Sequence, residues 1–237
     1  WRSSMDLYNY FTIIEKKTVL VSVASPRLVR ASLIAKLFSK VEDNQYVIGH
    51  MPYSDDGKKV IQENIAKTIT IIRDPRDMAL SMINHSRTRP QHHAHKYLFD
   101  ELNSESERLN AVLSGYDNHL GSLIGINQMY SSMLKWKEEV ENITLKFEDL
   151  VGHRGGGSNE NQILSIHNLI DYLDLVSEFD NEKVSNIAKN SFGVSGTFRK
   201  GKIGAWKDFF SHSDKELYKS KIGDLLIDIG YESDKNW

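Results

Sequence analysis

Residues 71–81 offer a cation and a hydroxyl in a setting that suits a phosphate. They read Ile-Ile-Arg-Asp-Pro-Arg-Asp-Met-Ala-Leu-Ser. Asp74 followed by proline, with Asp77 three residues later, is typical of a helix start with a capping box. Arg73 would then stand at the carboxyl end of a strand, where open α/β sheets bind ligands. Arg73 and Ser81 could therefore hold a phosphate, or Arg73 could pair with a cap aspartate while Ser81 faces solvent.

A second cationic segment lies near the C-terminus. Residues 198–207 read Phe-Arg-Lys-Gly-Lys-Ile-Gly-Ala-Trp-Lys and combine four cations with two glycines and no acid. Glycine lets the main chain approach an anion closely, so the segment could close on a phosphate. The alternative is an ordinary solvated basic loop.

His50 is the candidate general base. It follows the short apolar run 46–48, at the expected carboxyl edge of a strand. Histidine is the usual proton acceptor near neutral pH. The alternative is a packed histidine with one ring nitrogen bonded to a backbone carbonyl.

The elements that must position these residues alternate between strand and helix. Apolar runs rich in β-branched residues predict buried strands over residues 18–23, 46–48 and 68–72, and a weaker one over 143–147. Helical spacing of apolar residues predicts helices over 26–38, 75–84, 120–137, 161–175, 181–190 and 213–230. Such alternation predicts an α/β fold with a parallel sheet and crossover helices.

Composition narrows the classes of function. The 237 residues include 30 Lys and Arg against 32 Asp and Glu, a net charge of −2, and no Cys. Zero Cys excludes disulfides, thiol catalysis and cysteine-ligated metals. Near-neutrality gives no general reason to expect nucleic-acid or membrane-surface binding, and no apolar run is long enough to cross a bilayer. We expect a single cytoplasmic domain over 1–237; a first residue of Trp is compatible with a chain that lacks its natural start.

Residues 86–122 interrupt the alternation of strands and helices. The stretch is polar and carries His92, His93 and His95. These histidines are too close in sequence to share a standard ligand face, so no metal is expected. We expect a lid or an acceptor-side insertion here, with a surface helical excursion as the alternative.

Together these segments resemble the sulfotransferases that use 3′-phosphoadenosine 5′-phosphosulfate (PAPS). Residues 73–81 match the family's R-D-P-R-D-x-x-x-S element, and residues 199–207 are similar to its R-K-G-x-x-G-x-W element. Residues 146–150 resemble R-Y-E-D-L, and residues 49–52 resemble T-H-L-P. The four motifs occur in the family's order. The resemblance implies a three-layer P-loop-like α/β fold, with helices on both sides of a central parallel sheet.

The resemblance also implies roles for single residues. Arg73 and Ser81 would bind the 3′-phosphate of PAPS, and Arg199, Lys200 and the Gly201 backbone would close on the same phosphate. Aromatic contacts with the adenine would come from Phe147, which replaces the family's usual tyrosine, and from Phe192. His50 would take the proton from a hydroxyl or amine of a small-molecule or glycan acceptor during in-line sulfuryl transfer. No metal is required, and adenosine 3′,5′-bisphosphate (PAP) would be the product.

The family's first motif, the P-K-S-G-T phosphate loop, is not matched. Residues 21–30 read Val-Ser-Val-Ala-Ser-Pro-Arg-Leu-Val-Arg, and the first glycine of the chain is Gly49. Ser25 and Arg27 would be the remnant of the 5′-phosphate site. Either the loop has diverged, leaving an impaired nucleotide-binding module, or several residues are missing from the chain here. A related nucleotide-dependent transferase or kinase is the third reading, although the Walker A signature is lacking.

Overall fold

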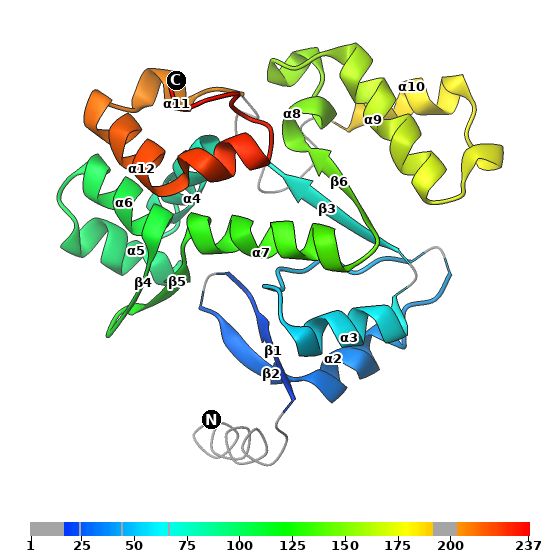
Figure 1. Cartoon of the computed structure of the whole chain (residues 1–237), viewed down its shortest axis with the longest axis horizontal. Coiled ribbons are helices and arrows are strands. Elements are labelled where there is room, and N and C mark those ends of the chain that lie inside the picture. The colour runs from blue at the N-terminus through cyan, green and yellow to red at the C-terminus, as the bar shows by residue number, and fades with distance from the viewer. Residues whose placement is uncertain (1–16, 24, 44, 66, 192–202) are drawn as a thin grey trace. The chain divides into compact units, whose positions relative to one another are not determined.

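The computed structural model describes residues 17–23, 25–43, 45–65, 67–191 and 203–237 (Figure 1). The chain forms two compact units, each built from two separate stretches. Unit 1 contains Trp1–Thr68 and His85–Glu141, and unit 2 contains Ile69–Asn84 and Asn142–Trp237. The single domain expected over 1–237 remains a prediction. No described helix is long and apolar enough to cross a membrane.

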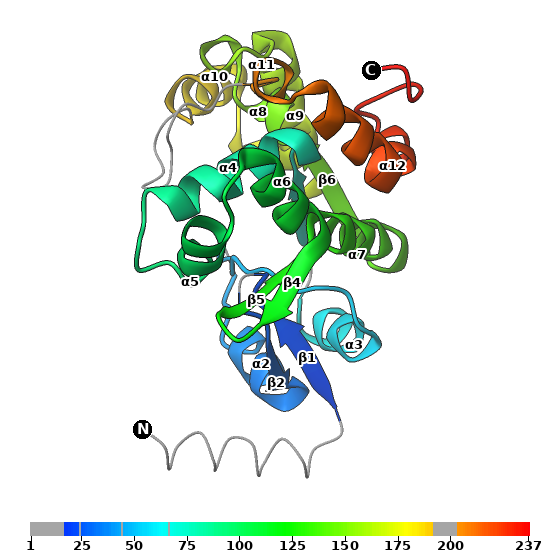
Figure 2. The ribbon, with the colours of Figure 1, turned by 90° about the vertical axis from the view of Figure 1, so that its left-hand side faces the viewer.

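The first part of unit 1 is a hairpin covered by two helices (Figure 2). Strands β1 (Thr18–Val21) and β2 (Arg27–Arg30) pair antiparallel, with Val21 opposite Arg27. They are followed by α2 (Ala31–Phe38) and α3 (Asp55–Asn64). A small apolar core joins Val19, Ala31 and Val60. The predicted start of the first helix, at residue 26, was therefore wrong. Residues 27–30 pair with β1, and the helix begins only after them.

The strand predicted over residues 46–48 is also wrong. These residues form no strand, and Tyr46 and Ile48 are 82% and 83% exposed. An apolar run becomes a strand only when a neighbouring strand takes up its backbone hydrogen bonds, which three residues of sequence do not reveal.

Residues 86–122 have a core of their own. Leu98, Leu109, Val112 and Leu113 are buried there. The elements are α5 (His93–His95), the π-helix η1 (Lys96–Glu101), α6 (Glu105–Ser114), and the antiparallel strands β4 (Gly115–Asn118) and β5 (Gly121–Ile124). Because β5 pairs with β4, the next helix, α7 (Ile126–Glu139), begins six residues later than the predicted 120–137.

Unit 2 is centred on two strands that are distant in sequence. Strand β3 (Thr68–Ile72) pairs with β6 (Asn142–Lys146), and the two run in the same direction (Figure 1). A second apolar cluster joins Ile166, Ile170 and Val184. The helices are α4 (Pro75–Arg87), α8 (Phe147–Leu150), η2 (His153–Gly155), α9 (Asn159–Tyr172), η3 (Val176–Glu178), α10 (Asn181–Asn190), α11 (Trp206–Phe209) and α12 (His212–Asp228).

Candidate functional site

Arg73 and Phe147 meet at the carboxyl ends of the two parallel strands of unit 2. Arg73 follows β3, and Phe147 follows β6 as the first residue of α8. The Arg73 guanidinium carbon lies 4.5 Å from the centre of the Phe147 ring. A cation is thus held against an aromatic face, at the sheet edge where the strand pattern predicted a ligand site.

Asp74 and Glu148 fasten the ends of these strands together. The Asp74 carboxylate accepts a 2.9 Å hydrogen bond from the Arg76 backbone N–H, which confirms the predicted N-cap. The Asp74 backbone N–H donates to Glu148 Oε1 at 2.9 Å. The Tyr231 hydroxyl donates to Glu148 Oε2 at 2.6 Å. Glu148 therefore connects the start of α4 with the C-terminal part of the chain. No sequence motif had indicated that Tyr231 takes part in this network.

The second arginine of the motif, Arg76, is a buried structural residue. Its side chain is 2% exposed and donates to Asp74 through Nε at 2.9 Å and through an Nη at 2.7 Å. Its other Nη lies 2.5 Å from a Glu232 carboxylate oxygen. The guanidinium carbon stands 3.7 Å from the centre of the Trp206 ring and 4.4 Å from that of Trp237. These contacts leave Arg76 inaccessible to a ligand.

Asp77 attaches the C-terminal motif to helix α4. Its carboxylate accepts hydrogen bonds from the backbone N–H groups of Gly204, at 2.6 Å, and Trp206, at 3.0 Å. Gly204 has a φ of +73°, a backbone geometry that favours glycine. The predicted capping box was wrong, because Asp77 bonds to this distant loop and the Asp74 N–H bonds to Glu148. Burial raises the pKa of Asp77, against the opposing effects of the two N–H groups and Arg73.

The remaining predicted phosphate ligands are only partly described. Ser81 is exposed on α4 in the same unit as Arg73. Phe192, Arg199, Lys200 and Gly201 lie outside the described residues.

His50 belongs to unit 1 and its side chain is exposed, which disfavours the packed histidine that the sequence left open. Its main chain is fixed on both sides. The Ser22 N–H donates to the His50 carbonyl at 2.8 Å, and the Trp136 indole N–H donates to the Met51 carbonyl at 2.8 Å. The fold therefore presents the imidazole on a tethered segment.

The stretch that corresponds to the family's phosphate loop is a turn between antiparallel strands. We call it the 22–26 turn; its residue 24 is outside the described part. Ser22 and Ser25 have positive φ values of 72° and 53°. The Ser25 N–H donates to the Ser122 carbonyl at 3.1 Å, and the Ile124 N–H donates to the Val23 carbonyl at 3.0 Å. In a phosphate cradle the backbone N–H groups are free to bind an anion. Here the N–H groups of Ser22 and Ser25 bond to carbonyl oxygens instead.

Arg27 is exposed at the first position of β2. The predicted strand–loop–helix arrangement around Ser25 and Arg27 was therefore wrong, because a strand separates the turn from helix α2. Any contact that these two residues make with a phosphate would have to come from their side chains.

Comparisons with known proteins agree with the sequence motifs. The family model described as "Sulfotransferase domain" matches residues 3–230. Among solved structures, the chain is similar to mouse sulfotransferase SULT7A1 complexed with PAP, with a TM-score of 0.54 and 16% identity. The match covers 73% of this chain and 64% of the mouse chain. No curated protein matches in a sequence comparison. The structural likeness confirms the α/β fold class, and the family match shows that the chain belongs to the sulfotransferase domain family.

Proposed function

We propose that the chain is a PAPS-dependent sulfotransferase that transfers a sulfuryl group to a hydroxyl or amine of a small-molecule or glycan acceptor. The observation that carries the proposal is the Arg73 guanidinium held on Phe147 at the edge of a parallel sheet, in a chain of the sulfotransferase family. The similar mouse protein carries PAP, which is what PAPS becomes on losing its sulfuryl group.

In this proposal unit 2 binds the nucleotide end of the donor. A guanidinium suits a phosphate, and the ring beside it suits adenine. The Phe147 ring holds the Arg73 guanidinium, and the bond from the Asp74 N–H to Glu148 holds the main chain beside it, so that binding costs little reorganisation. The 3′-phosphate ligands would be Arg73, Ser81, Arg199, Lys200 and Gly201, and the adenine contacts would be Phe147 and Phe192.

Unit 1 supplies the proposed base. His50 takes the proton of the acceptor hydroxyl while the acceptor oxygen forms its bond to sulfur. The bond between sulfur and the 5′-phosphate oxygen breaks in the same displacement, and PAP leaves with the electron pair. Ser25 and Arg27 would stabilise the growing charge on the 5′-phosphate through their side chains.

Two measurements test the proposal. PAP should raise the melting temperature of the protein at millimolar concentration, and more than ATP does. Transfer of sulfate from PAPS to a pool of acceptors, detected by mass spectrometry, should fall at least about 100-fold in His50→Ala, the size expected for a general base. His167→Ala, which removes an exposed histidine of α9, is the matched control. Absence of PAP stabilisation, or full turnover in His50→Ala, would contradict the proposal.

The second candidate is a nucleotide-binding module that has lost transfer. It is favoured by the 22–26 turn, whose Ser22 and Ser25 N–H groups bond to carbonyls. This candidate predicts that PAP stabilises the protein while PAPS yields neither sulfated acceptor nor slow hydrolysis. Stabilisation by ATP in preference to PAP would favour the third reading, a related nucleotide-dependent transferase or kinase.

A further inference from the structure

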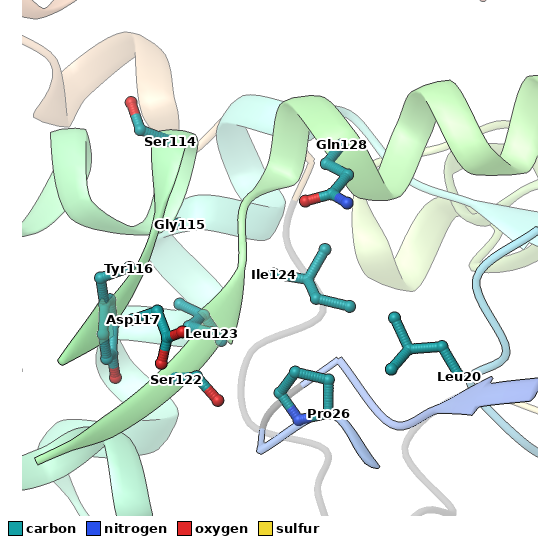
Figure 3. A pocket seen from close by; sticks show the side chains of 10 residues that line it. All are labelled: Leu20, Pro26, Ser114, Gly115, Tyr116, Asp117, Ser122, Leu123, Ile124 and Gln128. Carbon is teal, nitrogen blue, oxygen red and sulfur yellow. The ribbon is translucent and has the colours of Figure 1, made fainter. Parts of the chain in front are cut away.

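A cavity of about 640 Å³ lies within unit 1, beside the β4–β5 hairpin (Figure 3). Its walls come from the hairpin, the start of α7, β1 and the 22–26 turn. The lining residues that matter for recognition are Leu20, Pro26, Asp117, Ser122, Ile124 and Gln128.

One side of the cavity is polar. Asp117 and Ser122 are direct cross-strand partners in the β4–β5 pair, so their side chains are neighbours on the same face of the hairpin. Figure 3 shows the Asp117 carboxylate close to the Ser122 hydroxyl, with the Gln128 amide reaching in from the adjoining helix. Together these side chains offer hydrogen-bond acceptors and donors to a ligand in the cavity.

The other side of the cavity is apolar. Leu20, Pro26 and Ile124 present carbon surface there (Figure 3). A ligand that fits must therefore carry hydrogen-bonding groups on its edge and C–H groups on its face. A sugar ring has this division. A flat hydrocarbon would instead cover Asp117 and Ser122 without offering either of them a hydrogen bond.

The charge of the lining residues narrows the class of ligand further. Asp117 is the one charged side chain among the described residues that line the cavity. A carboxylate at the wall repels sulfate and uronate groups, and none of these lining residues is a cation that could offset the repulsion. This wall therefore favours a neutral sugar over a polyanionic glycan.

The cavity is connected to the proposed base through a single turn. Pro26 of the 22–26 turn lines the cavity, and the Ser25 N–H is bonded to the Ser122 carbonyl. The Ser22 N–H at the other end of the turn is bonded to the His50 carbonyl. Cavity wall and base thus lie on one hydrogen-bonded framework inside unit 1.

We propose that this cavity is the acceptor site and that the acceptor is a neutral carbohydrate, recognised by Asp117, Ser122 and Gln128. This inference rests on the proposed sulfotransferase function. Asp117 and Ser122 are then specificity-determining residues, distinct from the residues that would hold the nucleotide.

The test uses the full chain without donor and neutral methyl glycosides as probes, with saturation-transfer NMR as the readout. We expect methyl glucoside, galactoside or mannoside to give a signal at millimolar concentration, and methyl glucuronide to give none. Asp117→Asn combined with Ser122→Ala should weaken the binding about tenfold, as loss of hydrogen bonds to a charged acceptor does. Asp100→Asn, at an exposed carboxylate of η1 in the same unit, is the matched control and should bind normally.

The outcomes separate this inference from the proposed function. Normal stabilisation by PAP, with glycoside binding weakened about tenfold in the double variant, supports both. Three results would overturn the acceptor inference alone, provided that PAP stabilises the protein normally. These are no glycoside binding, equal binding of the glucuronide, and glycoside binding that the double variant does not change. If PAP does not stabilise the protein but glycoside binding still depends on Asp117, the cavity is a sugar site. The inference that this site binds the acceptor of a sulfotransferase is then overturned. Gln128→Phe, which places a ring in the cavity from an exposed helix position, is the second variant and should abolish the signal.

Discussion

Unit 2 fixes its candidate ligand residues through buried charges, whereas in the described part of unit 1 the bonds that hold the His50 segment run to its main chain. Around Arg73, the carboxylates of Asp74, Asp77 and Glu148 all have specific hydrogen-bond partners. Around His50, the bonds run from Ser22 and Trp136 to carbonyl groups, and the imidazole itself is exposed.

The difference matches what each kind of chemistry needs. A polyanion is bound best by cations that are already in place, because electrostatic stabilisation is strongest when no group has to reorganise. A base that must reach different hydroxyls gains from a free side chain on an anchored backbone. The two units thus predict opposite responses to mutation: loss of stability in unit 2, and loss of activity without loss of stability at His50.

The largest effect is expected from Arg76→Ala. The substitution leaves Asp74 and Glu232 without their cation and removes the group packed against Trp206 and Trp237. Breaking a buried ion pair on one side costs about 3–5 kcal/mol. We expect the free energy of unfolding of unit 2, measured by urea titration with NMR, to fall by this amount.

The control for Arg76 is Lys59→Ala in unit 1. Lys59 forms an exposed pair with Glu63 four residues along α3, and such pairs contribute little. A change in Lys59→Ala as large as that in Arg76→Ala would remove the contrast between buried and exposed charges.

A somewhat smaller effect is expected on nucleotide affinity from Arg73→Ala. Loss of a charged hydrogen-bond donor should weaken PAP binding by about 10- to 100-fold, which calorimetry can measure. Arg73→Lys retains the charge but loses the planar stack on Phe147 and should fall in between. Lys221→Ala, on the exposed face of α12, controls for the change in net charge; an equal loss there would refute a specific role for Arg73.

Acid should destabilise unit 1 through its histidine cluster. Burial, together with His93, His85 and Arg89, lowers the pKa of His92 from 6.5 to about 4. The unfolded chain therefore takes up this proton first, and the free energy of unfolding should fall as pH drops from about 6.5 to about 4.

The variant His92→Asn sharpens this test. His92 Nδ1 accepts from the Ala94 N–H at the start of α5, and asparagine keeps such an acceptor without a titrating group. The pH dependence of unit 1 stability should become flatter in the variant.

The contribution of Asp77 to the stability of unit 2 changes with pH in the opposite direction. Its raised pKa means that this contribution becomes less favourable as pH rises. Equal acid sensitivity of both units would contradict the assignment.

The smallest effect is expected from Ser25→Gly. Ser25 has a φ of 53°, which costs a residue with a side chain about 1 kcal/mol relative to glycine. We expect unit 1 to become more stable by up to about 1 kcal/mol, seen as a rise in melting temperature. Ser39→Gly, at a φ of −64°, should do the reverse, and a gain at both positions would mean that turn strain is not the cause.

Local signals in the sequence were sufficient for parts of the fold. Helix α10 has the predicted bounds 181–190, because the Asp180 side chain caps it through the Lys183 N–H. Strand β3 also has its predicted bounds. In both cases the information lies within a few residues of the element, as capping and β-branched runs require.

Non-local pairing was what the sequence could not show. The β4–β5 hairpin was missed because its strands are four residues each and have no long apolar alternation. The bond from Gly204 to Asp77 spans 127 positions, so local spacing assigned Asp77 to a capping box. The cavity beside Asp117 likewise exists only once β4 and β5 have paired.

The interleaving of the two units has a consequence for synthesis on the ribosome. All of unit 1 has been translated once Glu141 has been added, whereas β3 of unit 2 must wait for β6, and Arg76 must wait for Glu232. Domains generally fold as units during synthesis, the N-terminal one first, and unit 2 is complete only when its C-terminal segment has been made. A ribosome that stalls before Tyr231 would therefore leave a nascent chain in which Arg76 and Glu148 lack their C-terminal partners. Chaperone binding should be longest at that stage.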